Sequence, residues 1–341
     1  MLLTLALPVF NDAKALVASL DSVISALREV EQPVEVIVSD NCSSDGSFEA
    51  AQSSLGNFPN SRVVRQNMNV GFAGNLKALS ELSSAKYIWY LGAGDTLRPG
   101  HLAPIIRVLN EESPDFGTLH GSFNFHELPG KELETTRFSI AKGNQNSSVA
   151  LFNHAVSLNI IKREIMLALS APKISSTASS KNNLEPIPNP LYLWESETSY
   201  WPHLEAICQF LERGESEDKI WFEYEGLAVL LDNNKNGNWD KGLSAVKIFV
   251  EWASVAKRTA SAVPKARAAQ MLDGILHGKH LLKFMFMIRK DGTIPPSRAV
   301  EQIKSMDINF AIRYLSLLVS RLPMPVVRSL VFARSLLIKS L

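Results

Sequence analysis

Three short apolar segments near the start of the sequence each end in a small or acidic polar cluster, and helix-like stretches separate them. The segments are 5–12, 36–41 and 87–95, and a glycine-containing segment, 69–75, lies before the last of them. In an open α/β sheet, ligands gather where parallel strands end. The pattern therefore predicts an α/β domain with a mostly parallel sheet that delivers these polar residues, two carboxylates among them, to one edge.

The first two segments are separated by apolar residues that recur every three or four positions and so share one face of a helix. These residues are Leu16, Leu20, Val23, Ile24, Leu27 and Val30. We expect Asn11 or Asp12 to cap this helix. Ser43 or Ser44 is expected to cap a second helix that ends near Leu55.

Further elements are expected beyond this point. They are a strand over 62–65, a helix over 74–82, a helix that begins at Pro99 and ends near Glu111, and a strand over 158–161. Proline suits the first position of a helix because it needs no amide donor there. Residues 126–148 are polar and are expected to form a loop.

The length of 341 residues favours more than one small core. We expect residues 1–240 to form the α/β domain, with a first half over 1–125 and a second half over 126–240. Residues 241–341 have almost wholly helical signals. The polar stretch 171–190 is rich in serine and proline, and a loop of that length is usually functional or disordered.

Two general features bear on location. The two cysteines, Cys42 and Cys208, form neither a disulfide framework nor a metal-ligand pair, which favours a reducing cytoplasm. The apolar run 2–10 lacks a basic leader and a cleavage site, so we interpret it as a strand instead of a signal peptide. No stretch approaches the roughly 20 apolar residues of a membrane-spanning helix.

Charge is divided unevenly along the chain. Residues 1–249 contain 20 basic and 29 acidic residues, whereas residues 250–341 contain 15 basic and 5 acidic residues. Such a division suggests that the basic end meets a polyanion or anionic lipid, and a solvated helical surface is the alternative.

A helix over 309–322 would have the pattern of an interfacial helix, with a core-packing or dimer helix as the alternative. Its expected polar side contains Asn309, Arg313, Ser316, Ser320 and Arg321. Its expected apolar side contains Ile312, Leu315, Leu318, Val319 and Leu322.

The polar clusters suit a nucleotide bearing a diphosphate. Asp40 ends the second apolar segment, where a carboxylate can accept a hydrogen bond from a nucleobase imide or a ribose hydroxyl. Asn69, Gly71 and Asn75 surround the start of a helix, where free N–H groups favour a phosphate-bearing ligand. Asp95 can hold a divalent cation against the diphosphate, since oxygen ligands suit Mg²⁺ or Mn²⁺.

The order of these motifs resembles inverting family 2 glycosyltransferases of the GT-A fold. Residues 8–11, Pro-Val-Phe-Asn, are similar to their P-x-Y-N turn, and residues 39–46 are similar to their S-D-N-x-S-x-D-G segment. Asn69-Val70-Gly71 with Asn75 is similar to their N-x-G element. Residues 91–95, Leu-Gly-Ala-Gly-Asp, stand in the place of L-G-D-D-D, so that the first aspartate is absent.

The resemblance covers about residues 3–125. A weaker likeness, at 158–163, 200–204 and 236–239, extends to the abequosyltransferase-like subgroup that builds bacterial O-antigen and other surface polysaccharides. It implies inverting transfer of a hexosyl or deoxyhexosyl group from a nucleotide sugar to a saccharide linked to polyprenyl diphosphate. We also expect a cytoplasmic protein that lies on the inner face of the membrane through its basic C-terminal region, binds no nucleic acid and could form a homodimer.

The resemblance also implies roles for individual residues. Asp40 would contact the nucleobase, the Pro8–Asp12 turn would border the nucleoside, and Asp95 would be the principal ligand of Mn²⁺ or Mg²⁺. The expected donor-binding residues are Pro8, Phe10, Asn11, Asp12, Asp40, Asn41, Asn69, Gly71, Asn75 and Asp95.

An inverting transferase needs one general base to deprotonate the attacking hydroxyl. The candidates are Glu197, Glu195 and His203, which cluster with tryptophan and tyrosine just after the loop 171–190. For each of them taken singly, a solvated or capping role is the alternative.

Other classes compete with this interpretation. A Rossmann dehydrogenase would have G-x-G-x-x-G after the first strand, and a nucleotidyltransferase would have a glycine-rich, basic phosphate loop there; the chain has neither. The remaining alternative is a catalytically silent protein of the same fold that binds a nucleotide sugar or scaffolds a membrane assembly. The reduced Ala93-Gly94-Asp95 segment favours that alternative.

Overall fold

The structure, a computed structural model, describes residues 1–56, 58–122, 137–142, 155–169, 202–212, 220–231 and 310–327, together with residues 289, 304 and 329. The chain forms two compact units, Met1–Asn233 and Asn234–Leu341. The first unit contains all the described strands, and the second contains the described helix α12 (Phe310–Arg321).

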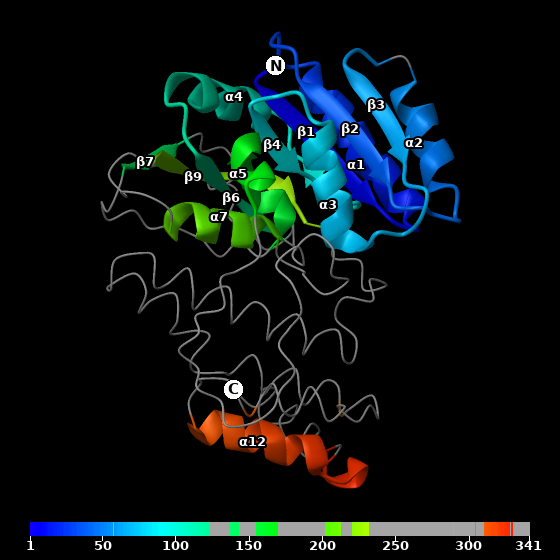
Figure 1. The fold of residues 1–341 in the computed structure, drawn as a ribbon, viewed down its shortest axis with the longest axis vertical. Helices are drawn as coiled ribbons and strands as arrows, with labels where there is room; N and C mark the ends of the chain where they lie inside the picture. The colour runs from blue at the N-terminus through cyan, green and yellow to red at the C-terminus, as the bar shows by residue number, and fades with distance from the viewer. Residues whose placement is uncertain are drawn as a thin grey trace. The chain divides into compact units, whose positions relative to one another are not determined.

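Strands and helices alternate through the first part of the chain, as the sequence predicts (Figure 1). In chain order they are β1 (Leu3–Val9), α1 (Ala13–Leu27), β2 (Glu35–Asp40), α2 (Ser47–Leu55), β3 (Ser61–Arg65), α3 (Gly71–Leu82), β4 (Tyr87–Tyr90), β5 (Thr96–Leu97) and α4 (Leu102–Glu111). The later described elements of this unit are β6 (Phe116–Ser122), β7 (Phe138–Lys142), the 3₁₀ turn η2 (Val156–Leu158), β8 (Asn159–Lys162), α5 (Arg163–Leu167), α7 (Pro202–Glu212) and β9 (Ile220–Leu230).

The described strands pair into one nine-stranded sheet with the order β3-β2-β1-β4-β8-β6-β9-β5, and β7 pairs with β9. The first four strands of this order are parallel. Strand β8 is antiparallel to both β4 and β6, whereas β9 is parallel to β6. Strands β5 and β7 are antiparallel to β9. Most strands therefore share one direction, which confirms the predicted mostly parallel sheet.

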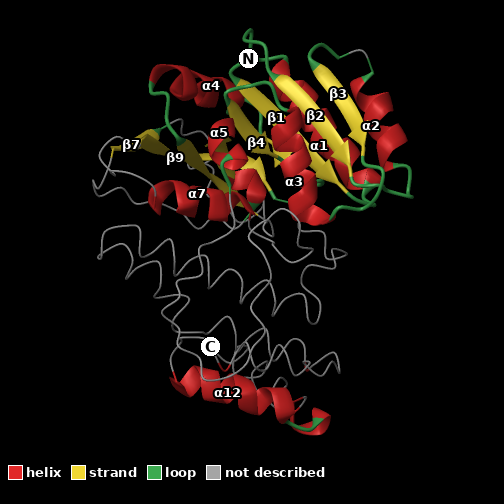
Figure 2. Ribbon diagram, in the orientation of Figure 1, coloured by secondary structure: helices red, strands yellow, loops and turns green. Residues whose placement is uncertain are grey.

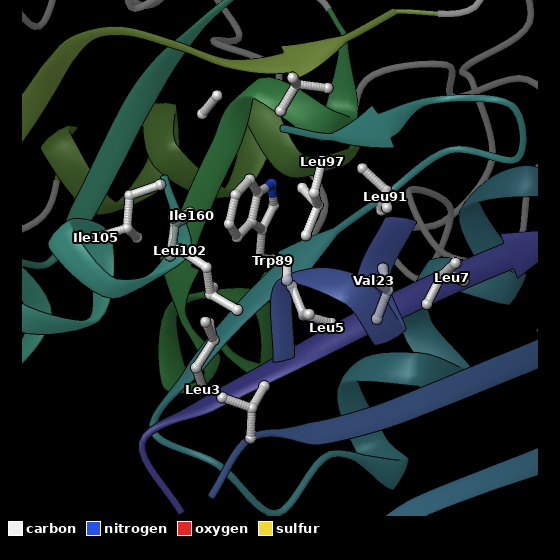
Figure 3. Packing of buried hydrophobic residues seen from close by; sticks show 14 of the residues in the cluster. Leu3, Leu5, Leu7, Val23, Trp89, Leu91, Leu97, Leu102, Ile105 and Ile160 are labelled. Carbon is white, nitrogen blue, oxygen red and sulfur yellow. The ribbon is translucent and has the colours of Figure 1, made fainter. Parts of the chain in front are cut away.

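Helices cover both faces of this sheet (Figure 2). On one face, Leu3, Leu5 and Leu7 of β1 lie in a single buried cluster with apolar residues of α1, α2 and α4, and Trp89 of β4 belongs to the same cluster (Figure 3). Helix α3 packs against β1, β2 and α5, and α5 packs against α7. Burial of a leucine side chain contributes about 1.5–3 kcal/mol to the free energy of folding. The buried leucines of α1 therefore stabilise the packing of this helix on the sheet.

Asp12, one of the two predicted residues, occupies the N-cap position of α1, but its side chain makes no capping hydrogen bond. Gly46 occupies the N-cap position of α2 in place of the predicted Ser43 or Ser44.

The first amides of both helices are instead bound by the side chain of Asp45. Its Oδ2 accepts a hydrogen bond from the Ala13 amide at 2.9 Å, and its Oδ1 accepts one from the Ser47 amide at 3.0 Å. These amides begin α1 and α2, where the helix dipole favours an anion. Burial raises the pKa of the Asp45 carboxyl, but the hydrogen bonds from Ser47 and Ala13 outweigh it and leave the pKa below its usual value.

Three further boundaries differ from the predictions. Helix α3 begins at Gly71, one turn before the expected start at residue 74. Helix α4 begins at Leu102 because Pro99 and Gly100 form a turn, in which the Gly100 amide donates to Glu29 Oε2 at 2.7 Å. Strand β7 lies in the stretch that was expected to be a loop, and its pairing with β9 explains why.

Glu35 is buried at the amino end of β2, where several hydrogen-bond donors contact its carboxylate. Thr4 Oγ1 donates to its carboxylate at 2.6 Å, and the amide and hydroxyl of Ser84 donate at 2.9 and 3.0 Å. Arg62 Nη2 lies 3.3 Å from Oε1. Burial raises the pKa of Glu35, but the bonds from Thr4 and Ser84 and the charge of Arg62 outweigh it, so that the pKa is lowered.

We expect Glu35→Gln to lower the free energy of unfolding at pH 7 by about 1–3 kcal/mol, because it removes charge-assisted hydrogen bonds. The folded pKa lies below the unfolded value, so the stabilisation is present above about pH 4.3 and is lost as pH falls through the folded pKa. Urea denaturation between pH 7 and pH 3 measures this. The variant should show a shallower loss of stability in acid than the unaltered chain, while Glu111→Gln, at an exposed position, should not. Equal acid dependence in the Glu35 variant and the unaltered chain would contradict the assignment.

Candidate active site

The carboxyl ends of the parallel strands meet at one edge of the sheet, as the sequence predicts. Val9 at the end of β1 pairs with Asp40 at the end of β2, and Ala6 of β1 pairs with Tyr90 at the end of β4. The loops that follow these strands therefore lie beside one another. Pro8 itself is a buried strand residue opposite Ser39.

The loops after β1 and β2 are joined by hydrogen bonds through predicted site residues. The Asn11 amide donates to Ser43 Oγ at 2.9 Å, and Asn11 Oδ1 accepts from the Ser44 amide at 2.8 Å. The Asp12 amide donates to Ser47 Oγ at 3.1 Å. Asn11 has a φ of 51°, in the left-handed region that asparagine tolerates better than most residues. The two loops thus form one structural unit.

Asp40 lies at the centre of this edge with its side chain fully buried. Both carboxylate oxygens accept from the Ser43 amide, at 3.3 and 3.2 Å, and Arg65 Nε lies 3.3 Å from Oδ2. The Arg65 guanidinium lies over the ring of Phe48, 5.4 Å from its centroid, and pairs with Glu49. Arg65 therefore balances the charge of Asp40 and is itself held in place from two sides.

Asn41, Asn69 and Gly71 lie together in the loop that leads into α3. Asn41 Nδ2 donates to Asn69 Oδ1 at 2.9 Å and to the Gly71 carbonyl at 3.2 Å, while Asn41 Oδ1 accepts from the Val70 amide at 2.8 Å. Asn69 Oδ1 also accepts from the Gly71 amide. These bonds place the N-terminus of α3 at the sheet edge, where the helix dipole favours an anion.

Asn75 is buried, as Asp40 and Asn41 are. Its Nδ2 donates to the Ser39 carbonyl at 2.9 Å, and its Oδ1 accepts from Ser39 Oγ at 2.6 Å. Gln66 donates to the same hydroxyl at 2.9 Å. With a side chain buried in this way, Asn75 fixes α3 to β2.

Apolar side chains are exposed along the same edge. Phe10, which follows β1, is 47% exposed, and Met68 and Val70, before α3, are 67% and 39% exposed. An exposed phenylalanine beside a polar cluster can stack on a planar ring such as a nucleobase. The edge thus combines an apolar rim with buried polar groups, as small-molecule sites commonly do.

Asp95 closes a tight turn after β4. Its amide donates to the Gly92 carbonyl at 3.0 Å, and the Gly94 amide donates to Ser19 Oγ of α1 at 2.9 Å. Gly94 has a φ of 95°, a conformation that side-chain-bearing residues rarely adopt. Ala93 packs against the hydrophobic cluster. Ala93 and Gly94 stand where the aspartate-rich pattern has two carboxylates, so Asp95 is the only carboxylate of this turn.

The donor set at this turn fits a magnesium or manganese ion that a nucleotide brings with it. Among the described residues, no group of three or more histidine, cysteine, aspartate or glutamate side chains could hold a metal ion by itself. In nucleotide sites, however, Mg²⁺ is commonly held by one or two carboxylates together with substrate phosphates. The single aspartate of this turn meets that requirement only when a diphosphate supplies the remaining ligands.

The structure places one of the three predicted base residues. His203 is the second residue of α7 and is 1% exposed. Glu195, Glu197 and the loop 171–190 lie outside the described residues.

Sequence reasoning missed several residues that shape the site. Asp45 was visible within the segment 39–46, but no role was assigned to it. Arg65 is the last residue of a predicted strand. The parallel pairing of this strand with β2 places Arg65 opposite Asp40, so the order of the strands in the sequence was the signal for this pair. Ser157, whose hydroxyl donates to Asp95 Oδ2, lies 62 residues away along the chain, and no local signal marks it.

Residues 4–148 match the model of Glycosyl transferase family 2. No protein matches in the comparison with curated proteins.

Solved structures show the same fold. Staphylococcus aureus TarS 1-349 in complex with UDP is 13% identical, with a TM-score of 0.54, over 94% of this chain and 87% of that chain. The complex of the same protein with UDP-GlcNAc gives the same values. The mannosyltransferase PcManGT from Pyrobaculum calidifontis, in complex with GDP-Man and Mn²⁺, is 13% identical, with a TM-score of 0.51, over 98% of this chain and 79% of that chain. The chain thus has the GT-A fold of these structures, and its residues 4–148 match the model of Glycosyl transferase family 2.

Proposed function

We propose that this chain is a glycosyltransferase that moves a sugar from a nucleotide-diphosphate donor to a hydroxyl group of a saccharide acceptor. One observation carries the proposal. The parallel strands β1, β2 and β4 end at one edge of the sheet, Asp40 ends β2, Asp95 follows β4, and all of them lie within the residues that match the family 2 model. The similar structures contain UDP, UDP-GlcNAc or GDP-Man, which supports a nucleotide sugar as the donor.

In the proposed reaction, the acceptor oxygen attacks the anomeric carbon as the bond from that carbon to the diphosphate oxygen breaks. Attack from the face opposite the leaving group inverts the anomeric centre. The hydroxyl proton passes to a general base, for which Glu197, Glu195 and His203 remain our candidates. A divalent cation on Asp95 would supply positive charge against the leaving nucleoside diphosphate. The amides at the start of α3 would stabilise the same charge.

The finer assignment rests on the sequence motifs. We propose a hexosyl or deoxyhexosyl transfer in bacterial surface-polysaccharide synthesis, of the abequosyltransferase-like type. The acceptor would be a saccharide on polyprenyl diphosphate, so the protein would work at the inner face of the cytoplasmic membrane.

A donor screen tests the proposed function. The purified full chain is heated with UDP-, GDP-, CDP- and dTDP-sugars, with and without Mn²⁺, and its melting temperature is recorded. We expect one nucleotide class to raise it, and slow release of that nucleoside diphosphate without an acceptor. Binding without release, even with saccharide acceptors, would favour the silent nucleotide-sugar-binding protein. Absence of binding to all four classes would overturn both interpretations.

Helix α12 supports the membrane part of the proposal, although its faces differ from the prediction. Ser316, Val319 and Ser320 are all buried, the two serines against expectation. Tyr314 and Leu318 are 60% and 44% exposed. Among the helices that the structure describes, none combines the length and apolar character needed to cross a bilayer. An exposed apolar face in a basic segment suits binding to the surface of an anionic membrane.

We expect the full chain to co-sediment with phosphatidylcholine vesicles only when they contain phosphatidylglycerol, and less so at high salt. The double change Leu315→Ser and Leu318→Ser should abolish this binding. Arg321→Glu should weaken it more than tenfold, because each basic residue near an anionic surface contributes about 1 kcal/mol and the reversal adds repulsion. Leu167→Ser, at an equally exposed leucine of α5, serves as the control. Unchanged binding in both α12 variants would leave α12 without a role at the membrane.

A further inference from the structure

Ser157 connects the Asp95 turn to a distant part of the chain. It lies in η2, just before β8, and is fully buried. Its Oγ donates to Asp95 Oδ2 and accepts from the Gly92 amide at 2.8 Å. One hydroxyl thus holds both ends of the turn that presents the aspartate.

The position of Ser157 is itself fixed. Trp89 Nε1 donates to the Ser157 carbonyl at 2.8 Å, and the Trp89 side chain is buried in the core (Figure 3). Asn159 Nδ2 donates to the Ala155 carbonyl at 3.0 Å, which closes the η2 turn from within. The serine hydroxyl is therefore held by the packed centre of the sheet.

The shape of the turn depends on this contact. The Asp95 carboxylate lies close to the α-carbon of Gly92, and a Cβ on residue 92 would come 3.0 Å from Asp95 Oδ2. The Gly94 amide, in the same turn, donates a hydrogen bond to Ser19 Oγ of α1. The carboxylate is thus fixed between a glycine that leaves room for it and a serine that binds one of its oxygens.

We propose that Ser157 is a positioning residue, which orients Asp95 toward the cation that accompanies the donor diphosphate. The inference rests on the proposed function, because it assumes that Asp95 holds this cation. With one carboxylate in the turn, the orientation of that carboxylate decides how well the cation binds. Partners that orient a metal ligand typically contribute 10–100-fold to metal affinity.

The test measures Mn²⁺ binding to the full chain by electron paramagnetic resonance, in the presence of whichever of UDP, GDP, CDP or dTDP binds the unaltered chain. Ser157→Ala should weaken Mn²⁺ binding 10–100-fold, while affinity for the nucleotide without metal stays within about twofold. Excess Mn²⁺ should restore turnover in Ser157→Ala but not in Asp95→Ala. Ser157→Thr, which retains the hydroxyl, should recover most of the Mn²⁺ affinity.

The control is Ser80→Ala, which removes another fully buried hydroxyl. Ser80 Oγ pairs with Tyr90 and with the Leu76 carbonyl, away from the turn. If Ser157→Ala fails to fold, Ser157→Cys, with a similar size and a weak donor, replaces it with the same expected loss. If Ser157→Ala keeps its Mn²⁺ affinity within twofold of the unaltered chain while Asp95→Ala loses it, the proposed role of Ser157 is wrong. The role of Asp95 would then still stand. Failure of the unaltered chain to bind any of the four nucleotides would overturn the proposed function as well.

Discussion

Asp95→Ala is expected to abolish turnover and to remove the metal-dependent part of nucleotide binding. Asp95 is the only carboxylate of its turn, since Ala93 and Gly94 precede it. No neighbouring carboxylate in the turn can therefore take over the cation. Isothermal titration of the nucleoside diphosphate, with and without Mn²⁺, measures the binding part, and release of nucleoside diphosphate from the donor sugar measures turnover.

Asp40→Ala is the matched comparison and should act differently. It should weaken nucleotide binding to the same degree with and without Mn²⁺, because we assign Asp40 to the base side of the proposed donor site and not to the diphosphate. Asp40 is also bonded to the Ser43 amide and paired with Arg65, so the urea midpoint of this variant must be measured alongside. Equal, metal-independent effects of the two alanine substitutions would contradict both assignments.

Loss of the general base is expected to lower the rate by 10²–10⁴, with donor affinity close to normal. We expect this from Glu197→Ala first, then from Glu195→Ala, then from His203→Ala. His203 is 1% exposed in α7, so its substitution also removes buried contacts and should lower the melting temperature. Single-turnover rates with saturating donor and acceptor separate the chemical step from binding.

The assignment of the general base is tested by comparing all three alanine variants. Glu164→Ala, at an exposed glutamate of α5, controls for general effects of removing a carboxylate. If all three candidate variants retain turnover within a few-fold of the unaltered chain, the base lies elsewhere and the interpretation of the 194–203 cluster is wrong.

The sequence determined the part of the fold whose signals are local. The apolar runs that became β1, β2 and β4 are short, buried and bounded by polar residues, and the stripe from Leu16 to Val23 has the helical period. Because parallel strands end at a common edge, their order alone predicted that Asp40 and the loop after β1 would meet. The structure confirms that meeting through the pairing of Val9 with Asp40.

Only the tertiary structure decided which distant groups meet. Strand β9 inserts between β6 and β5, and β7 is a strand because β9 is there to pair with it. The Asp45 side chain binds the first amides of α1 and α2, because the fold brings the start of α1, 32 residues earlier, beside the start of α2. Ser157 reaches Asp95 across 62 residues. A hydrophobic period records which face of an element is buried, but a serine or an aspartate has many possible partners, and the packed sheet alone determines which of them lies within 3 Å.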